Sequence, residues 1–166
     1  MSPPQHAELR EAIKKTVDTF VRGYQVASEH KDTKYLSTVL TPDCTRYFSP
    51  ASFLVLYGAP PGIGLDNATY EASFAAELPY GWCVGTDIAN VTIDTDARTA
   101  AATSTYTMQF ADGTALGDFE FAWFLTFTAD GGSVSKIVEW VDNTTTGKFH
   151  AKVKELQAKA EEAAEK

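Results

Sequence analysis

The most restrictive feature of the sequence is a pair of alternating stretches, residues 119–127 and 134–142, joined by the short turn-forming segment 129–133. Apolar side chains occupy every second position of the first stretch, which is the two-residue period of a β-strand with one buried face. If the short segment closes a hairpin, the same face continues through Ile137 and Glu139. The pattern therefore predicts an aromatic wall that contains one carboxylate.

A carboxylate in such a wall is costly to bury unless it is hydrogen-bonded, protonated or beside a cavity. An apolar surround raises the pKa of a carboxyl group and suits it to general acid or base chemistry near neutral pH. Glu139 is therefore the first candidate catalytic residue. Two other interpretations stay open. The carboxylate could bond only to a structural Tyr or Arg, or it could face solvent, because a one-residue slip of the register inverts every face.

The remaining patterns predict helices first and strands afterwards, which is an α+β order rather than an alternating parallel sheet. Turn sequences separate the later strands, so consecutive strands should be antiparallel. A curved sheet wrapped around the first helix would leave a conical cavity. The expected helices are 4–30, 32–40, 67–78 and about 147–166, and the expected strands are 45–48, 84–93, 99–110, 118–128 and 134–141, with an irregular segment at 49–64 that could form a lid.

Composition limits the function classes. With 166 residues, of which 44% are hydrophobic and 12% aromatic, the chain suits a single domain over residues 1–166 whose core also lines a pocket. A net charge of -8 argues against nucleic acid or an anionic membrane as partner. No cluster of His, Cys and carboxylate residues has metal-ligand spacing, so we expect no metal.

All three asparagines of the chain, Asn67, Asn90 and Asn143, open N-x-T glycosylation sequons. The first residues carry no apolar signal region. We therefore expect the cytosol, and the secretory pathway stays open if a signal peptide has been removed.

The order of these segments resembles the SnoaL-like branch of the NTF2-like superfamily, and more narrowly the fungal SnoaL-like proteins of secondary-metabolite clusters. The similarity covers about residues 9–142 and rests on LTPDCTR at 40–46, NATY at 67–70 and KIVEWVD at 136–142. The resemblance implies a cone-shaped, curved antiparallel sheet wrapped around N-terminal helices, an internal ligand pocket and a homodimer formed through the outer sheet face. Relatives include ketosteroid isomerases, polyketide cyclases and scytalone dehydratases, and many need no cofactor.

Two residues join Glu139 as catalytic candidates. Tyr106 would share the inward face of its strand and could donate a hydrogen bond to a developing oxyanion, or it could be an ordinary core tyrosine. Arg46 and Tyr47 are neighbours in the first strand, so alternation lets only one of them point inward. We favour Arg46, which beside Glu139 would form an acid–base or substrate-carbonyl pair, whereas an outward Arg46 would be a surface charge.

Aromatic side chains are expected to form the walls of the pocket, because their faces hold flat apolar ligands. On the opposite sheet face, Glu120 and Asp142 mix with Phe124 and Trp140, which suits a dimer interface or solvent. The expected substrate-binding residues are Tyr24, Tyr47, Tyr57, Tyr70, Trp82, Met108, Phe121 and Trp123, of which Tyr57, Tyr70 and Trp82 lie near the expected lid.

Together with these features, the resemblance implies a cofactor-independent isomerase, cyclase or dehydratase that acts on a hydrophobic secondary metabolite such as a polyketide, terpenoid or alkaloid. Glu139 would move a proton, and confinement alone could serve a pericyclic cyclisation of the hetero-Diels–Alder type. The histidines, His6, His30 and His150, fall outside the expected sheet, which disfavours the histidine-based dehydration of scytalone dehydratases. The alternatives are a non-catalytic binding protein for a small apolar metabolite and a structural dimer that fills its own cavity.

Overall fold

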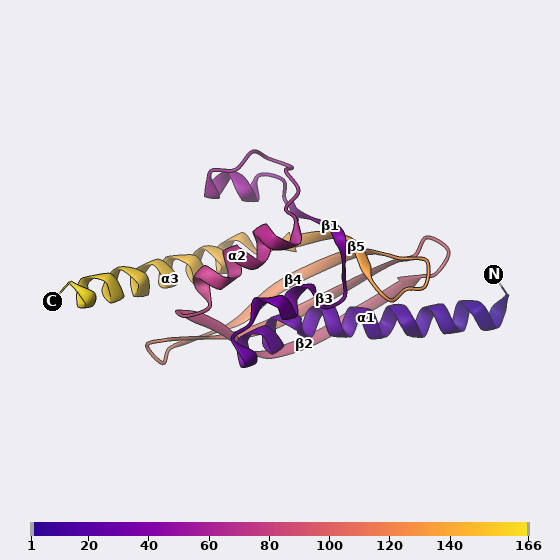
Figure 1. The fold of residues 1–166 in the computed structure, drawn as a ribbon, viewed down its shortest axis with the longest axis horizontal. Coiled ribbons are helices and arrows are strands. Elements are labelled where there is room, and N and C mark those ends of the chain that lie inside the picture. Colours follow the sequence, from indigo (N-terminus) through magenta and orange to yellow (C-terminus); the bar gives the residue numbers. More distant parts are fainter. Residues whose placement is uncertain (1, 166) are drawn as a thin grey trace.

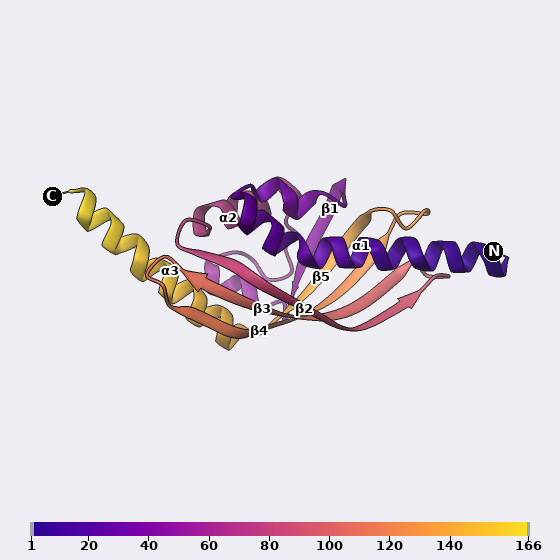
Figure 2. The ribbon, with the colours of Figure 1, turned by 90° about the horizontal axis from the view of Figure 1, so that it is seen from below.

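A strongly curved sheet of five strands runs through the molecule in the order β1-β5-β4-β3-β2 (Figures 1 and 2). The computed structural model describes residues 2–165, apart from the side chain of Leu56. Strands β2 to β5 pair antiparallel with their neighbours, as predicted, and β1 pairs parallel with β5. The elements are α1 (Pro3–His30), the 3-10 helix η1 (Thr33–Ser37), β1 (Leu40–Ser49), the 3-10 helix η2 (Phe53–Tyr57), α2 (Asn67–Glu77), β2 (Gly81–Asp94), β3 (Thr99–Phe110), β4 (Ala115–Phe127), β5 (Val134–Val141) and α3 (Asn143–Ala164).

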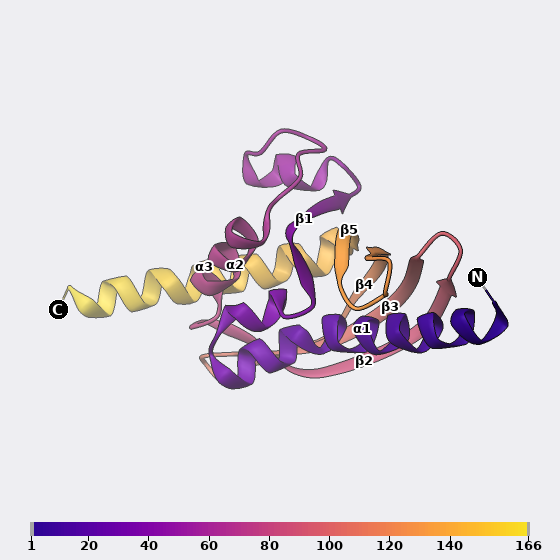
Figure 3. The same ribbon diagram turned by 45° about the vertical axis from the view of Figure 1, so that its right-hand side comes forward.

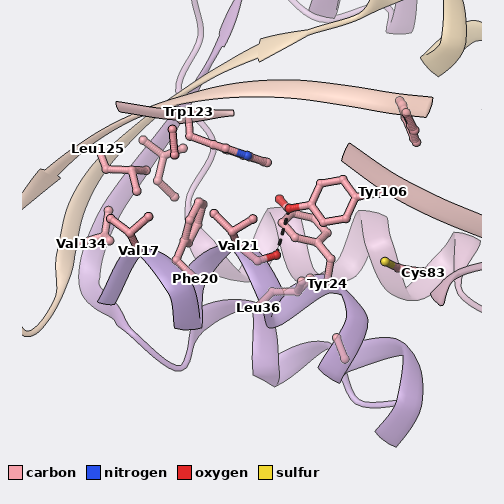
Figure 4. Packing of buried hydrophobic residues seen from close by; sticks show 14 of the residues in the cluster. Val17, Phe20, Val21, Tyr24, Leu36, Cys83, Tyr106, Trp123, Leu125 and Val134 are labelled. Atoms are coloured by element: carbon pink, nitrogen blue, oxygen red, sulfur yellow. Dashed lines mark hydrogen bonds between the residues drawn. The ribbon is translucent and has the colours of Figure 1, made fainter. Parts of the chain in front are cut away.

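Helix α1 supplies the layer that covers the sheet. Its buried residues recur at intervals of three and four, as the sequence predicted, and include Ile13, Val17 and Phe20. Figure 4 shows this helix face turned toward Trp123 and Leu125 of β4. The α+β class and the central role of the first helix are therefore confirmed.

The hairpin between β4 and β5 has the predicted register. Trp123 lies opposite Glu139, and Leu125 lies opposite Ile137. Its turn packs under α1, where the Thr16 hydroxyl donates a hydrogen bond of 2.7 Å to the carbonyl of Gly131. The short turn fixes the register, so Glu139 points to the same side of the sheet as Trp123.

Several boundaries differ from the sequence expectation. Strand β1 begins at Leu40 rather than at residue 45, and Pro42 lies inside it. Proline is tolerated there because β1 is an edge strand. Asp142 does not lie on the outer sheet face. Its side chain caps α3 by accepting hydrogen bonds from the backbone N–H groups of Thr144 and Thr145, so the helix begins four residues earlier than expected.

The segment between β1 and α2 rises away from the sheet (Figure 3). Its 3-10 helix η2 packs inward through Phe53 and Leu54, which form a small cluster with Val141 of β5. Helix α3 closes the same end of the sheet through Phe149, whose ring lies 5.5 Å from that of Phe110. In residues 2–165, no helix is both long and apolar enough to cross a membrane.

Candidate active site

A cavity of about 400 Å³ opens between the concave face of the sheet, α1, α2, η2 and α3. This volume lies in the range of small-molecule pockets, which run from about 300 to 1,000 Å³. Its walls are mostly aromatic, and a few polar groups interrupt them. The phenylalanines that line it are Phe48, Phe53, Phe74, Phe119, Phe121 and Phe149.

Glu139 is the carboxylate of the sheet wall. It lines the cavity, although only 3% of its surface is exposed, and β5 presents it opposite Trp123. The neighbouring strand β1 presents Arg46, which is also 3% exposed. Arg46 Nη1 donates a hydrogen bond of 2.5 Å to Glu139 Oε2. The described residues offer no hydrogen bond to Oε1, so this oxygen is available to a ligand.

Two tyrosines extend this ion pair into a network. Arg46 Nη1 also donates to the Tyr24 hydroxyl at 2.8 Å, and that hydroxyl lies 2.8 Å from the hydroxyl of Tyr70. The guanidinium carbon sits 3.7 Å from the centre of the Tyr70 ring, within cation–π range. Arg46 does not line the cavity but stands behind Glu139, Tyr24 and Tyr70, which do.

Burial sets the protonation of this network. It raises the pKa of Glu139, and the adjacent guanidinium of Arg46 offsets part of that rise. Burial also raises the pKa values of Tyr24 and Tyr70. Both phenols therefore keep their protons near neutral pH and can donate hydrogen bonds.

Tyr106 lines the cavity, but its hydroxyl already makes a hydrogen bond within the protein. The hydroxyl donates a hydrogen bond of 2.9 Å to the carbonyl of Val21 in α1 (Figure 4). It could reach a substrate oxygen only by breaking this bond. The Tyr70 hydroxyl, by contrast, is bonded to another hydroxyl, that of Tyr24, and either of the two can be the donor.

Three of the expected substrate-binding residues lie away from the cavity. Tyr47 follows Arg46 in β1 and turns to the other face, where its ring meets the ammonium of Lys136. Trp82 lines a separate surface groove beside Lys31. Trp123 is fully buried under the wall, and its indole N–H donates to the Ser104 hydroxyl. The expected residues that do line the cavity are Tyr24, Tyr57, Tyr70, Met108 and Phe121.

Helices α2 and α3 contribute a polar side that the sequence interpretation missed. His150 and Lys154 of α3 line the cavity together with Glu77 of α2. His150 Nδ1 and Glu77 Oε1 are 2.9 Å apart. The sequence correctly places His150 outside the sheet, but its helix closes the cavity. The four-residue spacing of Thr146, His150 and Lys154 beside the apolar positions of α3 is the signal that could have found them.

Neither cysteine takes part in a disulfide, and Cys83 lines the cavity as a buried thiol whose pKa is raised by burial. Among residues 2–165, no group of three or more His, Cys, Asp and Glu side chains is arranged to hold a metal ion. The polar chemistry of the cavity therefore rests on Glu139, the tyrosine hydroxyls and the α2–α3 side.

No protein-family model matches the sequence, and no curated protein does. Solved structures do resemble it. The pinacolase BvnE from Penicillium brevicompactum has a TM-score of 0.68 at 17% identity, over 87% of this chain and 92% of BvnE. PrhC from Penicillium brasilianum has a TM-score of 0.70 at 19% identity, over 90% of this chain and 93% of PrhC.

An NTF2-like protein from Burkholderia pseudomallei has a TM-score of 0.54 at 13% identity, over 83% of this chain and 96% of that protein. At these identities the likeness concerns the fold. The chain thus has the NTF2-like fold, in a form similar to that of the fungal proteins BvnE and PrhC, as the order of its sequence segments predicted.

Proposed function

We propose that the protein is a cofactor-independent isomerase or cyclase that acts on a hydrophobic small metabolite by moving a proton with Glu139. The observation that supports this proposal most strongly is the carboxylate itself. It is buried in an aromatic wall, one of its oxygens is held by Arg46, and the other is left for a ligand. A cavity that served only to store an apolar molecule would gain nothing from such a costly group.

The arrangement suits proton transfer at a carbon next to a carbonyl. Glu139 Oε1 would take the proton from the substrate carbon, and the electron pair would move onto the carbonyl oxygen to give an enolate. When the substrate is a β,γ-unsaturated ketone, this enolate is a dienolate, and return of the same proton to its γ-carbon completes an isomerisation with no change in oxidation state. Burial raises the pKa of Glu139, which strengthens it as a base relative to an exposed carboxylate.

Tyr70 is the proposed donor to the developing oxyanion. The Tyr24 oxygen accepts a hydrogen bond from Arg46, so the Tyr24 proton can point toward Tyr70. This leaves the Tyr70 proton free for the substrate, and the Arg46 cation over the Tyr70 ring favours its donation. The relation of these groups supports Tyr70 in the role that the sequence assigned to Tyr106.

The structural neighbour BvnE is consistent with an enzyme. BvnE is a pinacolase, so a similar fold supports an enzymatic activity.

We further propose that two copies associate through the outer sheet face, where Phe124 and Trp140 are 49% and 54% exposed.

Exchange of carbon-bound hydrogen tests the proposal. Apolar cyclic ketones that fit the cavity are incubated with the protein in deuterated water, and mass spectrometry follows their deuterium content. The wild-type protein should speed exchange of at least one ketone, and Glu139→Gln should abolish the acceleration. Glu120→Gln, on the outer face, is the matched control and should behave as wild type. Ketones that bind but are recovered without exchange would instead favour the binding protein.

A further inference from the structure

We propose that Thr146, His150 and Lys154 of α3 form a recognition stripe for an anionic oxygen at one end of the substrate. The inference rests on the proposed function and names the substrate class: an apolar body that carries a carboxylate, or an ionised enol or phenol. All three residues line the cavity. They follow one another at intervals of four, which places them on one face of the helix.

Thr146 carries the clearest sign of a missing partner. The residue is 4% exposed and lines the cavity, and among residues 2–165 its buried hydroxyl has no hydrogen-bond partner. Helical hydroxyls usually bond back to the carbonyl four residues earlier when nothing else is offered. Within residues 2–165, the hydroxyls of Thr16, Thr19, Ser28 and Ser73 do so. Because a buried hydroxyl without a partner is costly, that of Thr146 is suited to a ligand oxygen.

His150 is held in a fixed orientation beside it. Glu77 Oε1 lies 2.9 Å from His150 Nδ1, and an ionised carboxylate can only accept, so Nδ1 carries the proton. Nε2 is the ring atom left for the cavity. The ring of Tyr57 packs 4.9 Å from the imidazole and limits its movement.

Lys154 supplies the unpaired charge of the stripe. On the same helix, Lys152 pairs with Asp112 and Glu155, and Lys159 pairs with Glu155. Within residues 2–165 Lys154 has no ion-pair partner. The carboxylate nearest to the stripe in the cavity wall, Glu77, is already bonded to His150.

The opposite side of the cavity is less suited to an anion. There the charges of Arg46 and Glu139 neutralise each other, and the oxygen of Glu139 that faces the cavity would repel a second carboxylate. An acidic substrate therefore turns its anionic end toward α3. Its apolar body then lies between the two polar regions, against the aromatic walls, with its reacting carbon toward Glu139.

Two fluorescent probes that differ by one anionic group test this orientation. Anilinonaphthalene sulfonate and phenylnaphthylamine share an aromatic frame, and only the first carries a sulfonate. Titrations follow both probes with wild type, Thr146→Val, Lys154→Met and the control Lys148→Met. Lys148 is an exposed lysine of α3 that does not line the cavity. Thermal melting checks folding, and Thr146→Val should melt higher because it removes an unpaired buried hydroxyl.

The stripe predicts that Thr146→Val and Lys154→Met each weaken the sulfonate probe about three- to tenfold. Binding of the neutral probe, and of both probes to Lys148→Met, should stay within about twofold of wild type. If either stripe variant keeps wild-type affinity for the sulfonate probe, or if Lys148→Met weakens it equally, the stripe is overturned while the proposed function stands. If neither probe binds the wild-type protein, the stripe is overturned, and ketone exchange decides the proposed function separately.

Discussion

Arg46 pairs with Glu139 from behind the wall of the cavity, where Nη1 donates to Oε2 across 2.5 Å and each residue is 3% exposed. The two residues come from β1 and β5, which pair in parallel although they are far apart in the sequence. Removing two charges from water is costly, and the pair offsets that cost only while both partners are present. The ion pair therefore ties the stability of the sheet edge to the state of the candidate catalytic group.

The first prediction concerns the loss of one partner. Arg46→Met leaves the Glu139 carboxylate buried without its cation and should lower the free energy of unfolding by about 3–5 kcal/mol at neutral pH. The double variant Arg46→Met/Glu139→Leu removes both charges and should recover most of that loss. Urea unfolding of wild type, Arg46→Met, Glu139→Leu and the double variant measures the difference. A double variant that is as unstable as the two single losses combined would show that the residues do not act as a pair.

The second prediction concerns pH. Burial raises the pKa of Glu139 above its ordinary value, so the folded protein holds this proton more tightly than the unfolded chain does. The contribution of this group to stability is therefore full at acidic pH and is lost as pH rises through the pKa of the folded state. Arg46→Met removes the cation that offsets the rise. Its destabilisation should be small near pH ~4, where Glu139 is protonated, and should grow toward pH ~7. A cost that does not vary with pH would contradict this assignment.

The third prediction separates two tyrosines. Tyr70→Phe removes the phenol proposed for the oxyanion and should slow exchange of the ketone about a hundredfold. Tyr106→Phe removes a hydroxyl that is bonded to the Val21 carbonyl, so it should cost about 1 kcal/mol of stability and little activity. Rates and urea unfolding of both variants provide the test. A larger loss of rate in Tyr106→Phe would return the donor role to Tyr106.

The parts of the site that the sequence predicts are those set by local pairing. The short turn at 129–133 fixes Glu139 opposite Trp123, so one hairpin decides the face of the carboxylate. Alternation also separates Arg46 from Tyr47, but it cannot say which of the two points inward. That choice depends on the parallel pairing of β1 with β5, which no local signal specifies.

Sequence patterns predict less about the side of the cavity that the helices form. His150 and Thr146 line the cavity because α3 folds back from Asp142 and docks through Phe149 against Phe110 and Phe119. Periodicity predicts that α3 is a helix but not where it docks. In β2, alternation lets only one of the neighbours Trp82 and Cys83 face the cavity. Cys83 takes that position, and Trp82 lines the separate surface groove.

The fourth prediction concerns the turn that supports α1. Gly131 has φ +72, and an added Cβ would lie 2.9 Å from side-chain atoms of Leu9 and Ile13. Gly131→Ala should therefore destabilise the protein by more than about 1 kcal/mol. Gly113→Ala is the matched control, because Gly113 also has a positive φ, +84, but open space around it. Equal losses in the two variants would mean that contact with α1 contributes nothing.

The fifth prediction concerns assembly. If two copies associate through the outer face, light scattering should give a mass of twice the 18.1 kDa of one chain. Trp140→Glu places a charge on that face and should shift the mass to that of one chain. Ile63→Glu, which alters an exposed residue of the segment between β1 and α2, should leave the dimer intact. A wild-type protein with the mass of one chain would contradict the proposed dimer.

The pH dependence of hydrogen exchange is the most direct test of whether the ionised carboxylate of Glu139 takes the proton from the substrate. The rate of ketone exchange by the wild-type protein is measured from acidic to neutral pH, beside Glu139→Gln. If Glu139 is the base, the rate rises with pH through a pKa above the ordinary glutamate range, and the variant keeps a flat, background rate. The same rise in Glu139→Gln would show that another group takes the proton.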